Sequence, residues 1–253
     1  LFLLAGAVAA LIATRMLEHR DLGLGMVTAR PGPSGNPRLS TPEALAGRIH
    51  RGTLIGWAVG LAAFGLVTGA VASTSDDLLT GNPQLKDVMA HIGGAGAVSD
   101  MLLSVMGTLA GLTVGGYAIA TGLRMRSEEL ADRVGPVLAT PVGRIRWMAG
   151  HLGFVVVGPA LLLTTAGLVA GVLNSIEVGS LSAGFGGAFA AMLVQLPATL
   201  VLGGIAVALF GLAPRLTGLA WAALVAALLL GQLGQLLQLP QWVMDLSPYT
   251  HVP

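Results

Sequence analysis

The sequence predicts an all-α protein, a polytopic bundle of transmembrane helices. Of its 253 residues, 54% are hydrophobic and only 10% are charged, which is too few charges to cover a water-soluble domain of this size. The apolar stretches each run for about twenty residues, the length that a helix needs to cross roughly 30 Å of hydrocarbon. The charges lie between these stretches, and their sign alternates from one linker to the next.

Two segments precede the main bundle. Residues 1–14 are apolar but too short to cross a membrane, so we expect them to be the end of a truncated transmembrane helix. Residues 15–41 form a linker whose prolines and glycines break regular structure. Thr41 and Pro42 then predict a helix start, with a capping residue followed by proline in the first turn. The short amphipathic helix over 42–51 is expected to lie in the membrane interface as an elbow, unless it simply extends the next span.

Residues 42–253 form the second predicted unit, a bundle of transmembrane helices. After the helix over 42–51 we expect spans at about residues 54–75, 100–123, 148–173, 185–210 and 216–238. The linkers 15–51, 124–147 and 211–216 carry every basic residue except Lys86. Because basic residues concentrate in cytoplasmic loops, these three linkers are predicted to face the cytoplasm.

Glycine is abundant and recurs at intervals of four residues, a spacing that places it on one helix face and lets backbones approach closely. The predicted packing positions are Gly56, Gly60, Gly107, Gly111 and Gly115. We expect a tightly packed bundle that also contacts another half or subunit.

Few polar side chains fall inside the spans. An amide group in lipid needs a partner helix or a wet cavity, so Gln195, Gln232 and Gln235 are candidates for a substrate path. An interhelical hydrogen bond is the alternative explanation for these glutamines. Asp100 lies at the mouth of a span, where water reaches it. The lack of charged residues deeper in the spans argues against a carrier driven by an ion gradient.

Motifs for catalysis are absent from the sequence, and no catalytic, cofactor or metal residues are predicted. No segment fits the phosphate-binding pattern Gly-x-x-x-x-Gly-Lys-Ser/Thr, and neither His-Glu-x-x-His nor Gly-x-Ser-x-Gly occurs. The five histidines are scattered and there is no cysteine. A net charge of +1 gives no reason to expect a nucleic-acid partner. If ATP drives this protein, another chain or domain hydrolyses it.

The linker over 124–147 is the most specific feature. Ser127 is expected to cap a short helix whose first turn holds two glutamates, and Glu129 can pair with Arg133 one turn later. Such a helix, held between two spans, is suited to dock in the groove of a soluble partner, although a solvated loop fits the same pattern. The predicted contact residues are Ser127, Glu128, Glu129, Leu130, Asp132, Arg133 and Val137.

This linker also carries a family resemblance. Its sequence over 126–147, RSEELADRVGPVLATPVGRIRW, resembles a loop of bacterial ABC-2-type permeases, and most closely the actinobacterial multidrug and polyketide-antibiotic exporters. Residues 51–58 and 246–253 match the same group, so the resemblance covers most of residues 15–253. Val134 and Gly143 replace a charged residue and a serine of the family pattern, and we expect the loop to keep its role.

The resemblance implies a half of an ABC-2, or type V, exporter permease in a bacterial plasma membrane. The loop over 124–147 would be the coupling helix that contacts an ATPase subunit, most simply a dimer, which binds ATP and Mg²⁺. By the same resemblance, residues 1–14 would end a preceding half, residues 42–51 would be the elbow helix of the second half, and the final span of that second half would be missing. The other six-span half would lie in the same chain or in a second permease. Drugs or other amphiphilic compounds would be exported. The sequence leaves two alternatives open: an ion-gradient-driven carrier and a membrane scaffold without transport.

Overall fold

The computed structural model describes residues 2–18, 41–80, 96–234 and 237–252. The chain divides into two compact units, residues 1–38 and 39–253. The first unit contains α1 (Phe2–Glu18), which continues past the predicted helix end at residue 14. Most of the predicted linker over 15–41 lies outside the described residues.

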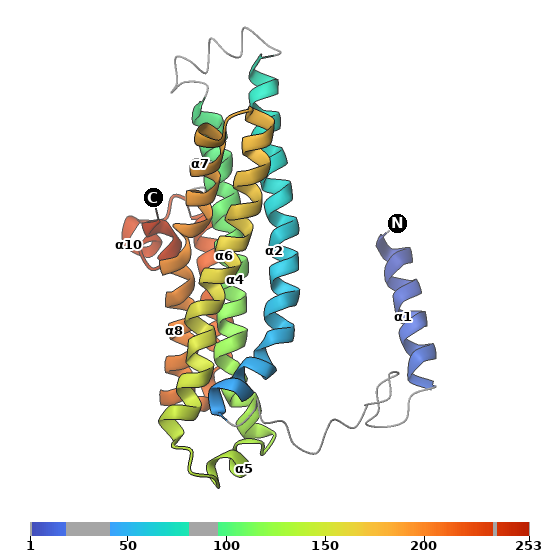
Figure 1. Ribbon diagram of the computed structural model, residues 1–253, viewed down its shortest axis with the longest axis vertical. Helices are drawn as coiled ribbons and strands as arrows, with labels where there is room; N and C mark the ends of the chain where they lie inside the picture. The colour runs from blue at the N-terminus through green and yellow to red at the C-terminus, as the bar shows by residue number, and fades with distance from the viewer. Residues whose placement is uncertain (1, 19–40, 81–95, 235–236, 253) are drawn as a thin grey trace. The chain divides into compact units, whose positions relative to one another are not determined.

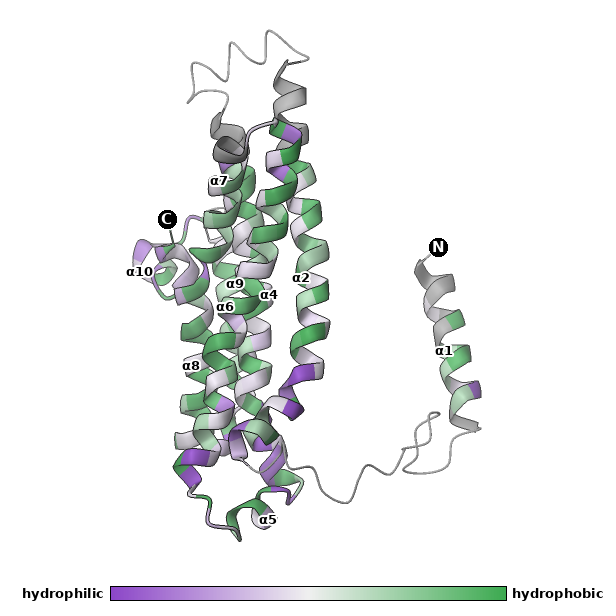
Figure 2. Ribbon diagram, in the orientation of Figure 1, coloured by the Kyte–Doolittle hydropathy of each residue, from purple (hydrophilic) through white to green (hydrophobic). Residues whose placement is uncertain are grey.

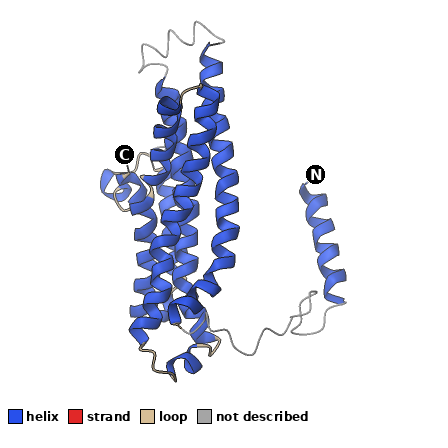
Figure 3. Ribbon diagram, viewed as in Figure 1, coloured by secondary structure: helices blue, strands red, loops and turns tan. Residues whose placement is uncertain are grey.

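The second unit is a bundle of helices, and no strand occurs among the residues that the structure describes (Figure 3). Its elements are α2 (Pro42–Thr80), α4 (Gly96–Leu130), α5 (Val134–Leu138), α6 (Arg144–Val178), α7 (Leu181–Leu193), α8 (Leu196–Leu212), η2 (Pro214–Leu216), α9 (Leu219–Leu233), α10 (Gln241–Met244) and η3 (Pro248–His251). The long helices lie side by side, with α5 at one end of the bundle (Figure 1). Hydrophobic residues cover these helices, and hydrophilic residues gather at the α5 end (Figure 2). The predicted all-α membrane fold is confirmed.

Four helical stretches are long and apolar enough to cross a membrane: Pro42–Val71, Asp100–Leu130, Arg144–Val178 and Gly184–Leu212. They correspond to the first four predicted spans of this unit. The predicted span over 216–238 is different, because α9 has only 15 residues. At 1.5 Å per residue it is about 22 Å long, short of the roughly 30 Å of hydrocarbon.

After α9 the chain folds back against the bundle. Met244 in α10 packs on Gly234, and Tyr249 in η3 packs on Gly111 and Gly115 of α4. The Tyr249 hydroxyl donates a hydrogen bond of 2.8 Å to the Gly111 carbonyl oxygen. The segment after α9 is therefore held by contacts with the middle of α4 and does not continue α9 as a straight span.

The predicted elbow is the beginning of α2. The amide of Ala44 donates to the Thr41 hydroxyl at 3.2 Å, which is the expected helix cap. The helix is continuous from Pro42 onward, but its first turns run obliquely to the rest (Figure 1). Ala46 and His50, one turn apart, are buried, and Ala46 packs against Gly150 of α6. These turns are thus docked on a neighbouring helix of the bundle.

Helix α4 is the most buried of the four spans, and three glycines bring it close to its neighbours. A Cβ added at Gly107 would collide with the Ala191 carbonyl oxygen of α7. At Gly111 it would lie 2.9 Å from Gln195 Cβ, and at Gly115 it would lie 2.7 Å from a methyl group of Leu202 in α8. No side chain larger than hydrogen fits at these three points, so the glycines set the distance between helices.

The glycines of α2 that pack closely against another described helix differ from the predicted ones. A Cβ at Gly56 or Gly60 would meet nothing within 4 Å, so neither residue packs against a described helix. The close approach of α2 to α6 occurs at Gly65 and Gly69 instead, against the Ala166 and Ala170 carbonyl oxygens. Spacing alone did not distinguish the two pairs, because both lie at intervals of four residues.

Several serine and threonine hydroxyls inside the spans are satisfied within their own helices. Five of them donate to the carbonyl oxygen four residues earlier: Thr68, Thr108, Thr113, Thr165 and Ser175. Such bonds remove the need for a partner on another helix. Another polar contact closes the turn between α6 and α7, where the Asn174 amide donates to the Gly184 carbonyl at 2.9 Å.

The glycine contacts of α4 predict a difference between two matched substitutions. Gly107→Ala should lower the free energy of unfolding by about 1–3 kcal/mol, because the added methyl group overpacks the contact with α7. Gly56→Ala should be neutral or stabilising by up to about 1 kcal/mol, since alanine is the better helix former. Thermal unfolding of both variants in detergent measures this. Equal stabilities would contradict the close contact at Gly107.

Candidate functional site

The C-terminal end of α4 is the first part of the candidate site, and the helix stops there in a defined turn. Asp132 has a backbone φ of +52°, a left-handed conformation that usually requires glycine. Its amide donates to the Glu129 carbonyl at 3.1 Å, and the amide of Arg133 donates to the Glu128 carbonyl at 3.1 Å. These two bonds form a Schellman motif, which satisfies carbonyl groups at a helix end. The turn redirects the chain from α4 toward α5.

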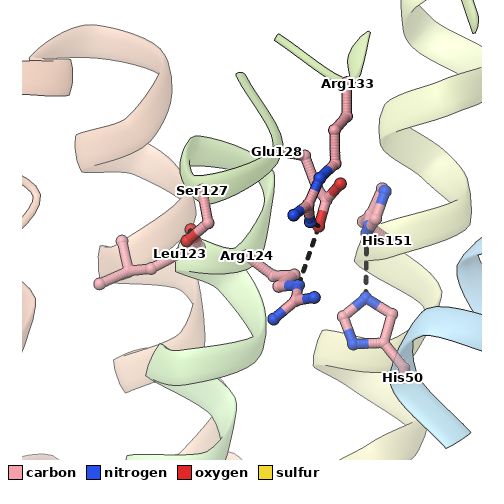
Figure 4. A network of polar contacts seen from close by, with 7 residues as sticks. All are labelled: His50, Leu123, Arg124, Ser127, Glu128, Arg133 and His151. Carbon is pink, nitrogen blue, oxygen red and sulfur yellow. Dashed lines mark hydrogen bonds and ion pairs between the residues drawn. The ribbon is translucent and has the colours of Figure 1, made fainter. Parts of the chain in front are cut away.

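Glu128 is the centre of a charge network at this turn. Its side chain is only 7% exposed, and its Oε1 accepts hydrogen bonds from Arg124 Nε at 3.1 Å and Arg133 Nη1 at 3.4 Å. Arg124 precedes Glu128 in the chain and Arg133 follows it, and both side chains reach the same carboxylate (Figure 4). The pair Glu128–Arg133 joins the first and last residues of the Schellman motif, a position where a hydrophobic contact is usual. The buried carboxylate thus fixes the turn after α4.

A buried histidine pair lies beside this network. His50 Nε2 of α2 and His151 Nδ1 of α6 are 2.9 Å apart, and both residues are at most 3% exposed (Figure 4). Phe154 stacks on His50 at 4.8 Å, and Trp147 packs edge-on to His151 at 5.0 Å. A hydrogen bond between two imidazoles needs one donor and one unprotonated acceptor. Sequence reasoning missed this pair, because no local pattern relates residues 101 positions apart.

A second ion pair connects the same two helices nearer the surface. Arg146 donates from Nε to Glu43 Oε1 at 2.8 Å and from Nη2 to Glu43 Oε2 at 3.4 Å. This two-point contact holds the start of α2 to the start of α6 in a defined orientation. Both side chains are about half exposed, so we expect orientation rather than stability to be the main effect.

The loop around α5 exposes apolar side chains among these charges. Leu130 is 70% exposed and Ile145 is 80% exposed, on either side of α5, and none of the five residues of α5 is buried. Val137, one of the predicted contact residues, is partly exposed. An exposed apolar patch that is bordered by charged residues is typical of an interaction site.

Two details of the predicted loop are corrected. Ser127 does not begin a short helix, because α4 continues through it to Leu130 and no glycine or proline lies between these two residues. The Ser127 hydroxyl lies 3.4 Å from the Leu123 carbonyl oxygen, one turn earlier. Good helix formers fill this stretch and extend the helix to Leu130. Glu129 pairs with Arg126 at 3.5 Å and not with Arg133, which the turn brings to Glu128.

Gln195 lies at a break between α7 and α8, where the sequence predicts one continuous span. Pro197 explains the break, because its ring lacks an N–H and clashes with the carbonyl group four residues earlier, in Leu193. Gln195 is 2% exposed, and its Oε1 has no hydrogen-bond partner among the described residues. The amide lies against Gly107 and Gly111 of α4.

The structure does not show the other two candidate glutamines beside Gln195. Gln232 is exposed on α9, and Gln235 lies outside the described residues. Of the predicted substrate path, only Gln195 lines a cavity described below. No group of three or more His, Asp or Glu side chains that could hold a metal ion occurs within the described ranges.

Two hollows adjoin α4. The first, the α2–α4 groove of about 540 Å³, is lined by Gly52, Thr53, Gly56, Trp57, Gly60, Leu61, Phe64 and Thr113. The second, the α4–α7 cavity of about 380 Å³, is lined by Asp100, Leu103, Ser104, Gly187, Ala190, Ala191, Val194 and Gln195. Both fall in the size range of small-molecule sites. Only the α4–α7 cavity has a charged side chain in its lining.

Glu128 and Glu129 provide a matched test of the charge network. Glu128→Gln should lower the free energy of unfolding by about 1–3 kcal/mol, because two arginines lose a buried charged acceptor. Glu129→Gln removes the same charge from an exposed pair and should cost less than about 1 kcal/mol. Thermal unfolding of the purified protein measures both. A larger loss for Glu129→Gln would refute the central role of Glu128.

Two comparisons with known proteins identify the family. A family model described as multidrug efflux system permease Rv1217c, C-terminal domain, matches residues 39–253, the extent of the second unit. The multidrug efflux system permease protein Rv1217c of Mycobacterium tuberculosis is 37% identical over 254 residues, which cover 100% of this chain and 46% of the relative. The chain therefore spans about half the length of the curated relative that it matches. The resemblance to ABC-type permeases is confirmed: the chain belongs to the multidrug efflux permease family, and residues 39–253 correspond to its C-terminal domain.

Proposed function

We propose that this chain is the C-terminal membrane half of the permease of an ATP-driven exporter, which moves drugs or other amphiphilic compounds out of a bacterial cell. The observation that carries the proposal is the loop around α5, which exposes Leu130 and Ile145 beside the charge network of Glu128. This loop is the docking surface for an ATPase subunit. The name of the relative, a multidrug efflux system permease, supports the export of drugs.

The loop is connected to the spans in a way that suits a coupling role. It follows directly from α4 and leads directly into α6, both of which are long enough to cross the membrane. The histidine pair joins α2 to α6 on this side, and Glu128 holds the turn that leads from α4 into the loop. A force on the loop therefore reaches three helices. ATP and Mg²⁺ bind to the partner ATPase, a dimer, and not to this chain.

The distribution of basic residues supports the orientation. Arg124, Arg126, Arg133, Arg144 and Arg146 all lie in the linker around α5. By the positive-inside rule this end faces the cytoplasm, together with linkers 15–51 and 211–216. The ATPase would approach from that side. The other six-span half, in the same chain or in a second permease, completes the pathway in the plasma membrane.

Purification tests the partner. The full-length permease, extracted in mild detergent, should retain a subunit with a phosphate-binding loop of the Gly-x-x-x-x-Gly-Lys-Ser/Thr type, which mass spectrometry would identify. Inside-out vesicles should accumulate an amphiphilic dye only when ATP is supplied. Transport that persists without ATP and stops with an uncoupler would instead establish an ion-gradient carrier.

Glu129→Arg tests the docking surface. Glu129 is exposed beside Leu130, so reversal of its charge should disturb the contact with the ATPase without disturbing the core of the bundle. We expect ATPase retention and ATP-dependent dye transport to fall by about tenfold or more, because like-charge contacts at an interface are strongly unfavourable. Glu177→Arg, at the opposite end of α6, is the matched control and should behave as the wild type. Normal transport by Glu129→Arg would remove the coupling role of this loop.

A further inference from the structure

The His50–His151 pair joins the oblique first turns of α2 to α6 through buried, titratable side chains. His50 Nε2 and His151 Nδ1 are 2.9 Å apart, and neither residue is more than 3% exposed (Figure 4). Ala46, one turn before His50, packs against Gly150, and Phe154 stacks on the His50 ring. The two imidazoles therefore face each other nitrogen to nitrogen, with little access to water.

The hydrogen bond between the two rings limits how many protons the pair can hold. A neutral imidazole has one N–H group and one bare nitrogen, whereas an imidazolium ion has two N–H groups and no acceptor. When both rings are neutral, or when one proton has been added, one of the two facing nitrogens can still accept. A second added proton places N–H groups on both facing nitrogens, and the hydrogen bond is lost. The closed pair thus carries at most one positive charge, while separated rings can carry two.

The charged groups around the pair do not remove this limit. Glu128 and Arg124 of α4 act electrostatically on both histidines with opposite signs, and they are bonded to each other. On α2 and α6 themselves, Glu43 and Arg146 are likewise paired. The ring neighbours of the histidines are aromatic and carry no charge. Two imidazolium ions in this buried place would repel each other without a carboxylate to neutralise both.

The other contacts that hold the first turns of α2 on α6 are weaker. Ala46 offers one methyl group to Gly150. The Glu43–Arg146 pair is about half exposed, so it contributes little to stability. Further along, α2 approaches α6 closely at Gly65 and Gly69. Loss of the histidine contact would therefore release the first turns of α2 and leave the rest of the helix in place.

We propose that the His50–His151 pair is a pH-sensitive latch, which holds the first turns of α2 on α6 and releases them when both imidazoles are protonated. The released form binds more protons than the closed form, so acid favours release and base favours closure. For each extra proton bound, the equilibrium between the two forms shifts by up to about tenfold per pH unit. This device depends neither on ATP nor on the identity of a transported compound.

Amide side chains provide the decisive variants. The glutamine amide takes the place of histidine Nε2, and the asparagine amide takes the place of histidine Nδ1. An amide has both a donor and an acceptor and does not titrate in this range. In His50→Gln the amide oxygen can accept from a protonated His151, and in His151→Asn it can accept from a protonated His50. Both variants should keep the contact and lose the response to pH.

Spin labels measure the release directly. Labels at Arg48→Cys and Ala149→Cys, two exposed positions, report the distance between the first turns of α2 and α6. This chain has no cysteine, and those elsewhere in the full-length permease are replaced by serine. In nanodiscs, lowering the pH from about 8 to about 4.5 spans the ordinary titration of histidine. With both histidines present, electron paramagnetic resonance should show a longer-distance population that grows as the pH falls. His50→Gln and His151→Asn should keep the short distance throughout.

Glu43→Gln is the matched control, because it removes the other polar contact between the same turns and leaves both histidines; its response to pH should remain. Labels at Val67→Cys and Val172→Cys, exposed positions further along the same two helices, should show no change. A short distance that persists at the acid limit in the protein with both histidines would overturn the proposal. So would an equal response in His50→Gln and His151→Asn, since another group would then cause the release. Either variant alone suffices if the other does not fold.

Discussion

The close approach of α4 to the helices around it is the constraint on which the rest of the bundle depends. Lipid chains are as apolar as the helices, so burial of apolar surface does not by itself drive helices together in a membrane. Association requires close packing of backbones, and α4 achieves it with Gly107 against α7, Gly111 against Gln195 and Gly115 against α8. The same face receives Tyr249 from the end of the chain. Four elements thus meet on one row of glycines.

The α5 end of the bundle follows a different principle, because polar contacts replace glycine packing there. Glu43–Arg146 and His50–His151 join α2 to α6, while Glu128 fixes the turn that leaves α4. Exposed ion pairs contribute little to stability. Buried polar groups, in contrast, are costly if their partners are removed, so they favour one arrangement over its alternatives. The three helix ends are therefore held in a specific register, close to the loop around α5.

Much of the fold was predictable, because a membrane imposes rules that the sequence displays directly. Backbone groups in hydrocarbon must be satisfied within a helix, so long apolar stretches marked four spans, although the spans of the structure extend up to twelve residues beyond the predicted limits. Thr41 was recognisable as a helix cap because capping is local chemistry. The length of α9 was not predictable from hydropathy, because its end depends on contacts of Met244 and Tyr249 with distant glycines.

The sequence indicated which segment to consider as the candidate site, but not how its side chains are arranged. The linker over 124–147 was recognisable by its charges. Asp132 adopts a left-handed conformation without being a glycine, so the sequence did not indicate a turn at this position. The pairing of Arg133 with Glu128, which depends on that turn, was therefore not predicted. Pro197 was a visible signal for the break at Gln195. The pairing of His50 with His151 had no signal, because a single sequence contains no record of contacts between distant residues.

The uninterrupted length of α4 has a mechanical consequence. Its 35 residues form a rod about 52 Å long without a proline, held near its middle by the glycine contacts. A rod that pivots at its middle acts as a lever, so a tilt of ~5° displaces its two ends by about 2 Å in opposite directions. A push at the α5 end would therefore move Asp100 and Ser104 the other way. The broken pair α7–α8 is free to bend at Gln195 instead of tilting as one body, so the two walls of the α4–α7 cavity would separate or close.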